Sequence, residues 1–289
     1  MFELYSRFNA ARFAVECRLE NHIGGDGDAR YKKHEINWKG QILRLNMSQM
    51  SKDFLKIRPN GVVLDVIIPS FRMNNHKILR SILSLSCSVP VYVKFWMVVD
   101  RPDPQHSSDV KALAASVNVQ VLSCPENRGA SFARMFGYNF STADWALFLD
   151  DDVIPSCHLL DAYVGALTRY PDAKVFVGST RLPVATNTWT KMLRTCKIMF
   201  FYGIAEHMTH PPWGVTANLM VRGSRHNSTI QFKNIYPKTG GGEDIDFCFQ
   251  FKNWHTAKGG DRIIVSVTGA EATHPWWKGG SICYDQINE

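Results

Sequence analysis

The sequence predicts an α/β fold, in which a mostly parallel β-sheet is flanked by helices and preceded by an N-terminal extension. Two observations support this prediction. The 289 residues are 45% hydrophobic and 20% charged, which is typical of a globular protein and excludes a disordered or fibrous chain. From residue 61 onward, short apolar runs rich in β-branched residues alternate with segments whose apolar residues recur at helical spacing. Such alternation is typical of parallel strands joined by helices.

The first half of this main domain is the more regular half. Its opening run, GVVLDVIIPS, is β-branched and ends at a proline, as expected of a buried parallel strand. The predicted strands cover residues 61–70, 94–100, 117–123 and 143–152. The predicted helices between them cover residues 74–86, 107–116 and 129–141.

The second half is harder to interpret. A helix over residues 158–171 is followed by a strand over 173–182. Residues 187–208 are apolar but interrupted by charges, and they carry no clear period. A glycine-rich loop at 240–242 precedes a helix, and a late strand at 261–269 leads to EATHPWWKGG.

Residues 1–60 differ from the rest and form the predicted extension, which leaves 61–289 as the main domain. Four apolar residues recur at helical spacing near the start: Leu4, Phe8, Ala11 and Val15. This stripe must bury against the domain, a partner subunit or a membrane surface. The first residues have charges throughout and no uninterrupted apolar core, so we expect neither a signal peptide nor a membrane span. A cytoplasmic location, with peripheral membrane contact as an option, fits best.

Charge and cysteine content narrow the function classes. The chain has 33 Lys and Arg against 26 Asp and Glu, which gives a net charge of +7. This excess suits a nucleotide, a phosphorylated substrate or an anionic membrane surface, or it serves solubility alone. No dense Lys/Arg stripe occurs, so nucleic acid is not expected as a partner. The seven cysteines lack a C-x-x-C pair, which argues against zinc and disulfides and favours a reducing compartment.

Three consecutive aspartates, Asp150 to Asp152, follow the predicted strand ending in ALFL. Ligands of open parallel sheets bind beyond the carboxyl ends of the strands. If the chain stays extended, Asp150 and Asp152 point the same way. Adjacent carboxylates repel each other unless a cation relieves them, and Mg²⁺ or Mn²⁺ prefers such oxygen ligands. The alternative interpretation is a solvated acidic turn.

Four stretches between residues 62 and 275 stand in an order that one family shares: DVIIPSFRMN, MVVDRPDP, ENRGASFARMFGYNFSTADWALFLDDDV and GGGEDIDFCFQFK. They resemble, in turn, the opening strand with its nucleotide loop, the second strand, the N-x-G-x-x-x-A-R stretch before a D-x-D motif, and the acceptor motif of inverting glycosyltransferases of family 2. The resemblance implies a GT-A fold and a metal-dependent enzyme that uses a nucleotide-sugar donor and a glycan or other hydroxyl acceptor.

The resemblance also implies a donor site. Asp100 would accept a hydrogen bond from the base, as a uracil N–H needs, which favours a UDP-sugar over a GDP-sugar. Asp150 would hold the ribose and contribute to the metal site, Asp152 would bind the metal, and Asp151 would share either role. His274 would be a third metal ligand, unless it is an ordinary core or surface histidine. The other implied donor-site residues are Pro69, Ser70, Phe71, Arg72, Asn127, Gly129 and Arg134.

Glu243 and Asp244 follow three glycines, which let the backbone approach a substrate closely. The resemblance implies that Asp244, beside Glu243, is the base that takes the proton of the acceptor hydroxyl. One such carboxylate suffices for a single displacement, which inverts the anomeric carbon. The alternative is an acid pair that stabilises a helix N-terminus. The segment PPWGVTANLM resembles the acceptor-side strand of the family. The implied acceptor-side residues are Trp213, Gly214, Asn218 and Trp276, with Trp277 as an option for stacking on the sugar.

Two departures from the family pattern matter. The second strand ends in Asp100-Arg101-Pro102-Asp103, whereas relatives often have two acids followed by glycine and serine, so uridine is only the favoured base. The Q-x-x-R-W motif of processive synthases is absent, which indicates a non-processive enzyme.

Two other functions compete with this interpretation. A nucleotidyltransferase that makes nucleotide sugars can share a related fold, but this chain lacks a G-T-R-L loop at its first strand. A non-enzymatic carbohydrate- or nucleotide-binding module would bind the same ligands without turnover. P-loop, G-x-S-x-G and G-x-G-x-x-G motifs are also absent, which argues against a kinase, an α/β-hydrolase and a dehydrogenase.

Overall fold

The computed structural model describes residues 34–36, 43–45, 61–71, 76–89, 91–101, 119–197, 199–233, 235–236, 241–256, 262–278 and 281–282. The chain divides into two units, Met1–Pro59 and Asn60–Glu289. In the first unit, strands β1 (His34–Ile36) and β2 (Leu43–Leu45) pair antiparallel, whereas the sequence indicates helical or irregular structure there. The apolar stripe from Leu4 to Val15, the helix expected over 107–116 and Arg72 lie outside the described residues.

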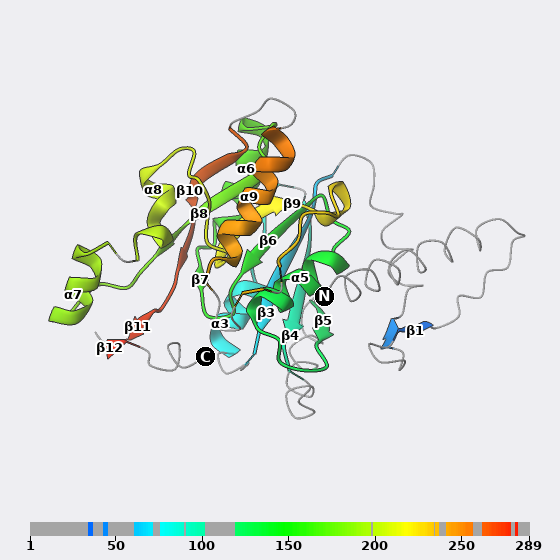
Figure 1. Ribbon diagram of the computed structural model, residues 1–289, viewed down its shortest axis with the longest axis horizontal. Coiled ribbons are helices and arrows are strands. Elements are labelled where there is room, and N and C mark those ends of the chain that lie inside the picture. The colour runs from blue at the N-terminus through cyan, green and yellow to red at the C-terminus, as the bar shows by residue number, and fades with distance from the viewer. Residues whose placement is uncertain are drawn as a thin grey trace, which may run out of the picture. The chain divides into compact units, whose positions relative to one another are not determined.

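The second unit contains strands and helices in alternation (Figure 1). The strands are β3 (Val63–Ser70), β4 (Tyr92–Val99), β5 (Val119–Ser123), β6 (Trp145–Leu149), β7 (Ile154–Pro155), β8 (Val175–Arg181), β9 (Asn218–Arg222), β10 (Ile264–Thr273), β11 (Trp277–Lys278) and β12 (Ser281–Ile282). The α-helices are α3 (His76–Leu83), α5 (Ala130–Phe140), α6 (Leu159–Arg169), α7 (Thr188–Thr195), α8 (Ile204–His207) and α9 (Glu243–Thr256), and the 3-10 turns are η1 (Phe200–Gly203) and η2 (Ser224–His226).

Eight of the described strands form one sheet in the order β5-β4-β3-β6-β9-β8-β10-β7. β3 pairs parallel with both β4 and β6, and β8 pairs parallel with β10. β9 lies antiparallel between β6 and β8, so β8 and β10 run in the same direction as β6. Apart from β9 and β7, the strands of this sheet therefore share one direction, which confirms the predicted mostly parallel α/β fold.

Helices cover both faces of the sheet, because successive side chains of a strand point to opposite faces. Leu64, Val66 and Ile68 of β3 belong to the same buried cluster as residues of α3 and α6. Ile67 points the other way, toward α5, where a Cβ built on Gly137 would lie only 2.6 Å from its side chain. A glycine at position 137 therefore lets α5 pack directly on β3 and β4.

The apolar segment at 187–208 forms α7, η1 and α8, which belong to the long connection between β8 and β9. Only Thr190 and Leu193 of α7 are buried, so this helix is largely exposed. Its charged residues therefore interrupt the apolar residues of the segment. Within the described part of the chain, no helix is both long and apolar enough to cross a bilayer.

Candidate active site

Polar side chains gather at one edge of the sheet. Ser70 is the last residue of β3. Asp100, Asp150 and His274 directly follow β4, β6 and β10, respectively. These four strands run in the same direction, so their carboxyl ends meet at the same edge, where open α/β sheets bind their ligands.

The triple aspartate forms a turn after β6. The backbone N–H of Val153 donates to the carbonyl of Asp150 at 3.2 Å, so the expectation of an extended chain is wrong. The turn nevertheless separates the three side chains. Asp151 accepts a hydrogen bond from Ser70 at 2.5 Å, whereas Asp150 and Asp152 lie beside His274.

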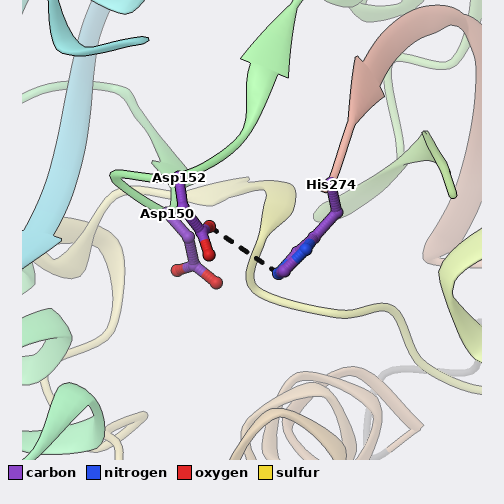
Figure 2. Close-up of side chains that lie close together, drawn as sticks. All are labelled: Asp150, Asp152 and His274. Carbon is purple, nitrogen blue, oxygen red and sulfur yellow. Dashed lines mark ion pairs between the residues drawn. The ribbon is translucent and has the colours of Figure 1, made fainter. Parts of the chain in front are cut away.

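Asp150, Asp152 and His274 form a cluster suited to a cation (Figure 2). Each offers one ligand atom, and these atoms all lie within 4.8 Å of one another. Nε2 of His274 lies 3.6 Å from a carboxylate oxygen of Asp152. Burial lowers the pKa of His274 despite the opposing charge of Asp150, so a neutral imidazole with a free lone pair is available near pH 7. Two carboxylates and an imidazole are a donor set that fits Mn²⁺.

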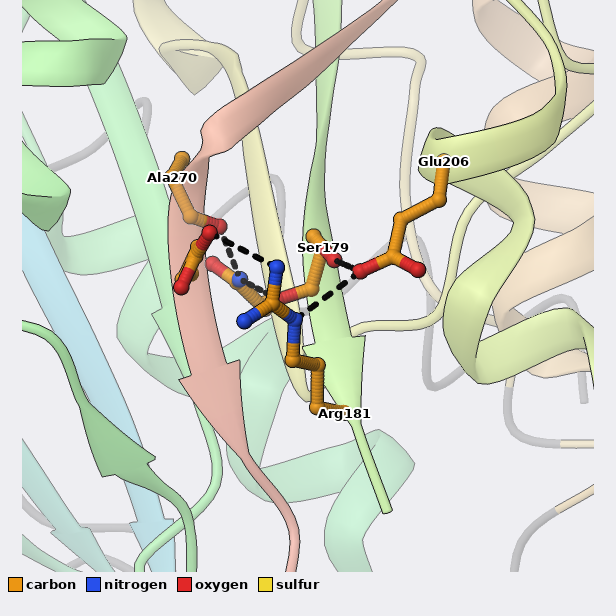
Figure 3. Close-up of polar contacts among 6 residues, drawn as sticks. Ser179, Arg181, Glu206 and Ala270 are labelled. Atoms are coloured by element: carbon orange, nitrogen blue, oxygen red, sulfur yellow. Dashed lines mark hydrogen bonds and ion pairs between the residues drawn. The ribbon is translucent and has the colours of Figure 1, made fainter.

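The strand end that carries His274 is tied to β8. The backbone N–H of His274 donates to the carbonyl of Arg181 at 2.9 Å. The Arg181 guanidinium in turn donates to Glu206 of α8 at 3.0 Å, as Figure 3 shows. It also donates to Glu271 of β10 at 2.9 Å. These contacts connect β8, α8 and β10 close to His274. They thereby help to orient the histidine side chain toward Asp150 and Asp152.

Tyr202 is a neighbour of the cluster that sequence reasoning missed. Its ring centroid lies 5.0 Å from that of His274, and the side chain of Trp276 lies close to its hydroxyl. Burial, followed by the charges of Asp150 and Asp152, raises the pKa of this hydroxyl. No motif marks Tyr202, because it lies in the irregular connection between β8 and β9.

Arg134 of α5 joins the aspartates to the acceptor motif. Its side chain is buried, and its guanidinium contacts Asp150 at 2.6 Å and Glu243 at 3.2 Å. Burial alone would lower the pKa of this arginine, but the attraction of the two carboxylates raises it. The arginine thus stays charged and offsets part of the negative charge at the site.

Glu243 and Asp244 begin α9. Gly241 and Gly242 before them adopt φ values of 118° and 92°, which only glycine tolerates readily. The resulting turn lets Glu243 accept a hydrogen bond from the N–H of Gly241 at 2.6 Å. Burial, followed by the charge of Glu243, raises the pKa of Asp244 to about 6.

Asp100 is buried, and its carboxylate accepts hydrogen bonds from two backbone N–H groups. These belong to Arg128 at 3.0 Å and to Gly129 at 2.6 Å. Gly129, with a φ of 91°, precedes the first residue of α5. Asp100 therefore positions the loop before α5, a role that the sequence did not indicate.

The other predicted donor-site residues lie around this loop. The Asn127 side chain accepts from the N–H of Gly129 at 3.1 Å. Pro69 is buried in β3, next to Val98 of β4. Phe71 follows β3 and has the guanidinium of Arg101 5.6 Å from its ring centroid.

Of the four predicted acceptor residues, Gly214 and Asn218 are buried, whereas Trp213 and Trp276 are partly exposed. Trp276 lies beside Tyr202, and the ring of Trp213 stacks on Phe201 at 5.9 Å. Gly214 is buried against Val177. The Asn218 amide is fully buried and donates to the carbonyl of Ala270 at 2.8 Å, so its hydrogen bonds serve the packing of the sheet.

Comparison with solved structures identifies several with a similar fold. S. aureus TarS 1–349 aligns with a TM-score of 0.53 and 14% identity over 74% of this chain and 60% of that one. The mannosyltransferase PcManGT from Pyrobaculum calidifontis, in complex with GDP-Man and Mn²⁺, gives 0.55 and 14% over 81% and 65%. GalNAc-T7 with UDP, GalNAc and Mn²⁺ gives 0.54 and 13% over 77% and 45%. At such identities the likeness establishes a GT-A-like fold.

A comparison with curated proteins found no match. The chain spans 60% of the TarS 1–349 structure that it resembles. Residues 65–227, more than half of the chain, match the family described as "Glycosyl transferase family 2". This range runs from β3 to the end of η2, so it includes Asp100, Arg134 and the triple aspartate. The chain therefore belongs to glycosyl transferase family 2.

Proposed function

We propose that this protein transfers a sugar from a nucleotide-diphosphate donor to an acceptor hydroxyl, with inversion at the anomeric carbon. One observation carries the proposal: the guanidinium of Arg134 contacts both Asp150 of the cation cluster and Glu243 beside the candidate base. A site for the donor diphosphate and a site for deprotonating the acceptor thus share one buried arginine.

Asp150, Asp152 and His274 would hold a divalent cation, Mn²⁺ by preference. When bound, the cation would offset the negative charge that grows on the diphosphate as the sugar leaves. The presence of Mn²⁺ in PcManGT and GalNAc-T7 supports this assignment.

Asp244 would take the proton of the acceptor hydroxyl. A pKa of about 6 leaves the carboxylate deprotonated at neutral pH, and it makes Asp244 a stronger base than an ordinary aspartate. Glu243 is held by Arg134 and by the Gly241 N–H, so we assign it a positioning role. One base on the acceptor side requires no covalent intermediate, which gives a single displacement.

Metal-dependent hydrolysis of nucleotide sugars tests the proposal. With a panel of UDP- and GDP-sugars, we expect slow hydrolysis of at least one donor with Mn²⁺ and none with a chelator. Asp152→Ala and His274→Ala should each abolish the Mn²⁺-dependent hydrolysis. Asp172→Ala, which removes a surface acid after α6, serves as the control. A protein that only binds nucleotide sugars would be stabilised thermally by a donor without hydrolysing it. Equal hydrolysis with Mn²⁺ and with chelator would contradict the metal role.

The proposed nucleoside of the donor is uridine, and Asp100 is the residue proposed to bind its nucleobase. The donors in the related structures are of both kinds, UDP-GlcNAc in TarS and GDP-Man in PcManGT, so the support comes from Asp100 alone. An unmade buried hydrogen bond costs about 1–3 kcal/mol. Asp100→Asn should therefore weaken UDP binding by about 5- to 150-fold, measured by calorimetry.

The same substitution needs a stability control, because Asp100 also accepts two backbone N–H bonds. The melting temperature of Asp100→Asn without nucleotide reports that structural loss, and Asp103→Asn should leave UDP affinity unchanged. If GDP binds the unaltered protein more tightly than UDP does, the uridine assignment fails.

A further inference from the structure

Exposed apolar side chains are concentrated in the connection between β8 and β9. Of the nine large apolar residues that are exposed in the described part of the chain, five lie between residues 182 and 217: Val184, Trp189, Met192, Phe200 and Met208. Trp189 of α7 is 52% exposed, although tryptophan normally buries most of its surface. Exposed apolar residues that share one connection are candidates for an interaction surface, and two of these lie on a single helix.

Helix α7 presents part of this surface in a fixed orientation. Thr190 and Leu193 anchor the helix in the domain. Trp189 and Met192 are three residues apart and thus lie on one exposed face. The side chain of Asn187 accepts from the N–H of Thr190 at 2.8 Å, which caps the helix. Figure 1 shows α7 at the periphery of the second unit, away from the side of the sheet formed by β3, β4 and β5.

The first part of the same connection carries charge of one sign, and the acid that follows it, Glu206, is paired with Arg181. Residues 182–205 contain no Asp or Glu, and they contain Lys191, Arg194 and Lys197. All three basic residues are exposed. We call Trp189, Met192 and these three basic residues the α7 surface. A capped helix with an exposed tryptophan and methionine beside basic residues matches the chemistry of a lipid headgroup layer, where the ring inserts and the cations meet anionic lipids.

We propose that the α7 surface docks this protein on an anionic lipid bilayer. Charge complementarity favours the bilayer over two other occupants. A second copy of the chain would bring an identical basic surface. Residues 1–60 contain 11 Lys and Arg against 7 Asp and Glu, so they would add positive charge as well. Tyr202, which packs on His274, lies in the same connection between β8 and β9, so docking would hold the site close to acceptors on the membrane surface; this last step rests on the proposed function.

Vesicle co-sedimentation of the full chain tests the docking. The probes are vesicles of phosphatidylcholine alone and vesicles that also contain phosphatidylglycerol. We expect binding to the second kind only, and weaker binding as salt is raised. Trp189→Ser with Met192→Ser, and separately Lys191→Gln with Arg194→Gln and Lys197→Gln, should each lower the partition coefficient about tenfold or more.

The matched control is Phe249→Ser with Lys252→Gln on α9, an exposed apolar residue and its neighbouring lysine, whose Nζ lies 5.5 Å from the ring centroid. This variant should bind vesicles like the unaltered chain. Equal binding to neutral vesicles, or unchanged binding of both α7 variants, would overturn the docking proposal. So would a dimer in solution that the α7 variants dissociate. Donor hydrolysis without vesicles should persist in all variants. Its absence would count against the proposed function, whereas the vesicle result tests the docking independently of that function.

Discussion

Asp244→Asn should reduce turnover with donor and acceptor by about 10²- to 10⁴-fold, the usual contribution of a general base. The amide keeps the shape of the carboxylate but cannot take a proton from the acceptor hydroxyl. Donor affinity should stay close to that of the unaltered protein, because the cation cluster and Asp100 are untouched. Steady-state kinetics with saturating donor and calorimetry with UDP and Mn²⁺ measure the two quantities.

Asp246→Asn is the matched control for this substitution. Asp246 lies on the same helix, but its carboxylate is engaged by Lys233 at 2.6 Å and by Gln250 at 2.7 Å. Its loss should change turnover little. An Asp244→Asn enzyme with full turnover would move the base elsewhere, and NMR that detects retention of the anomeric configuration would exclude a single displacement.

The raised pKa of Asp244 adds a pH signature to the same experiment. The base acts only when deprotonated, so turnover should decline as the pH falls through about 6, roughly tenfold per pH unit below that value. The residual activity of Asp244→Asn should lack this decline, because the amide does not titrate.

Strands β3, β4, β5, β6, β8 and β10 could be predicted from sequence because each begins with, or consists of, a short apolar run. Strand β6 ends at Leu149 and not at residue 152, since three adjacent carboxylates cannot enter a buried strand and turn out of it instead. Strand β9 overlaps the segment PPWGVTANLM, which resembles the acceptor-side strand of the family, but its antiparallel direction could not be predicted. Its sequence, NLMVR, has an apolar centre like the strands beside it, and its direction depends on the long connection from β8 and not on any local pattern.

The candidate site was predictable where a motif and a strand end coincide. The motif and the late histidine group Asp150, Asp152 and His274 from sequence, and in the structure their ligand atoms lie within 4.8 Å of one another. The contacts of Arg181, Tyr202 and Asp100 were not, because they depend on side chains from distant elements. The sequence indicates that such residues are polar or aromatic, but not which backbone group or ring they meet.

Arg134→Met should have the largest effect on stability. The substitution keeps an unbranched, flexible side chain, but it leaves the carboxylates of Asp150 and Glu243 without the cation that they contact in a buried site. Removing one member of a buried ion pair costs about 3–5 kcal/mol of unfolding free energy, which chemical denaturation can measure. Arg225→Met is a suitable control, because Arg225 pairs with Asp144 at a more exposed position and its loss should cost at most about 1 kcal/mol.

A second substitution separates the ion pair from simple packing. In Arg134→Met, the carboxylate of Glu243 is left without its positive partner. Adding Glu243→Gln removes this unpaired charge, so the double variant should be more stable than Arg134→Met alone. Arg134 also lowers the pKa of Asp244, so the decline of turnover at acid pH should move to higher pH in Arg134→Met. A stability loss with no such pH shift would make Arg134 a packing residue only, whereas both effects together would establish that one buried guanidinium sets the charge of the cation cluster and of the base.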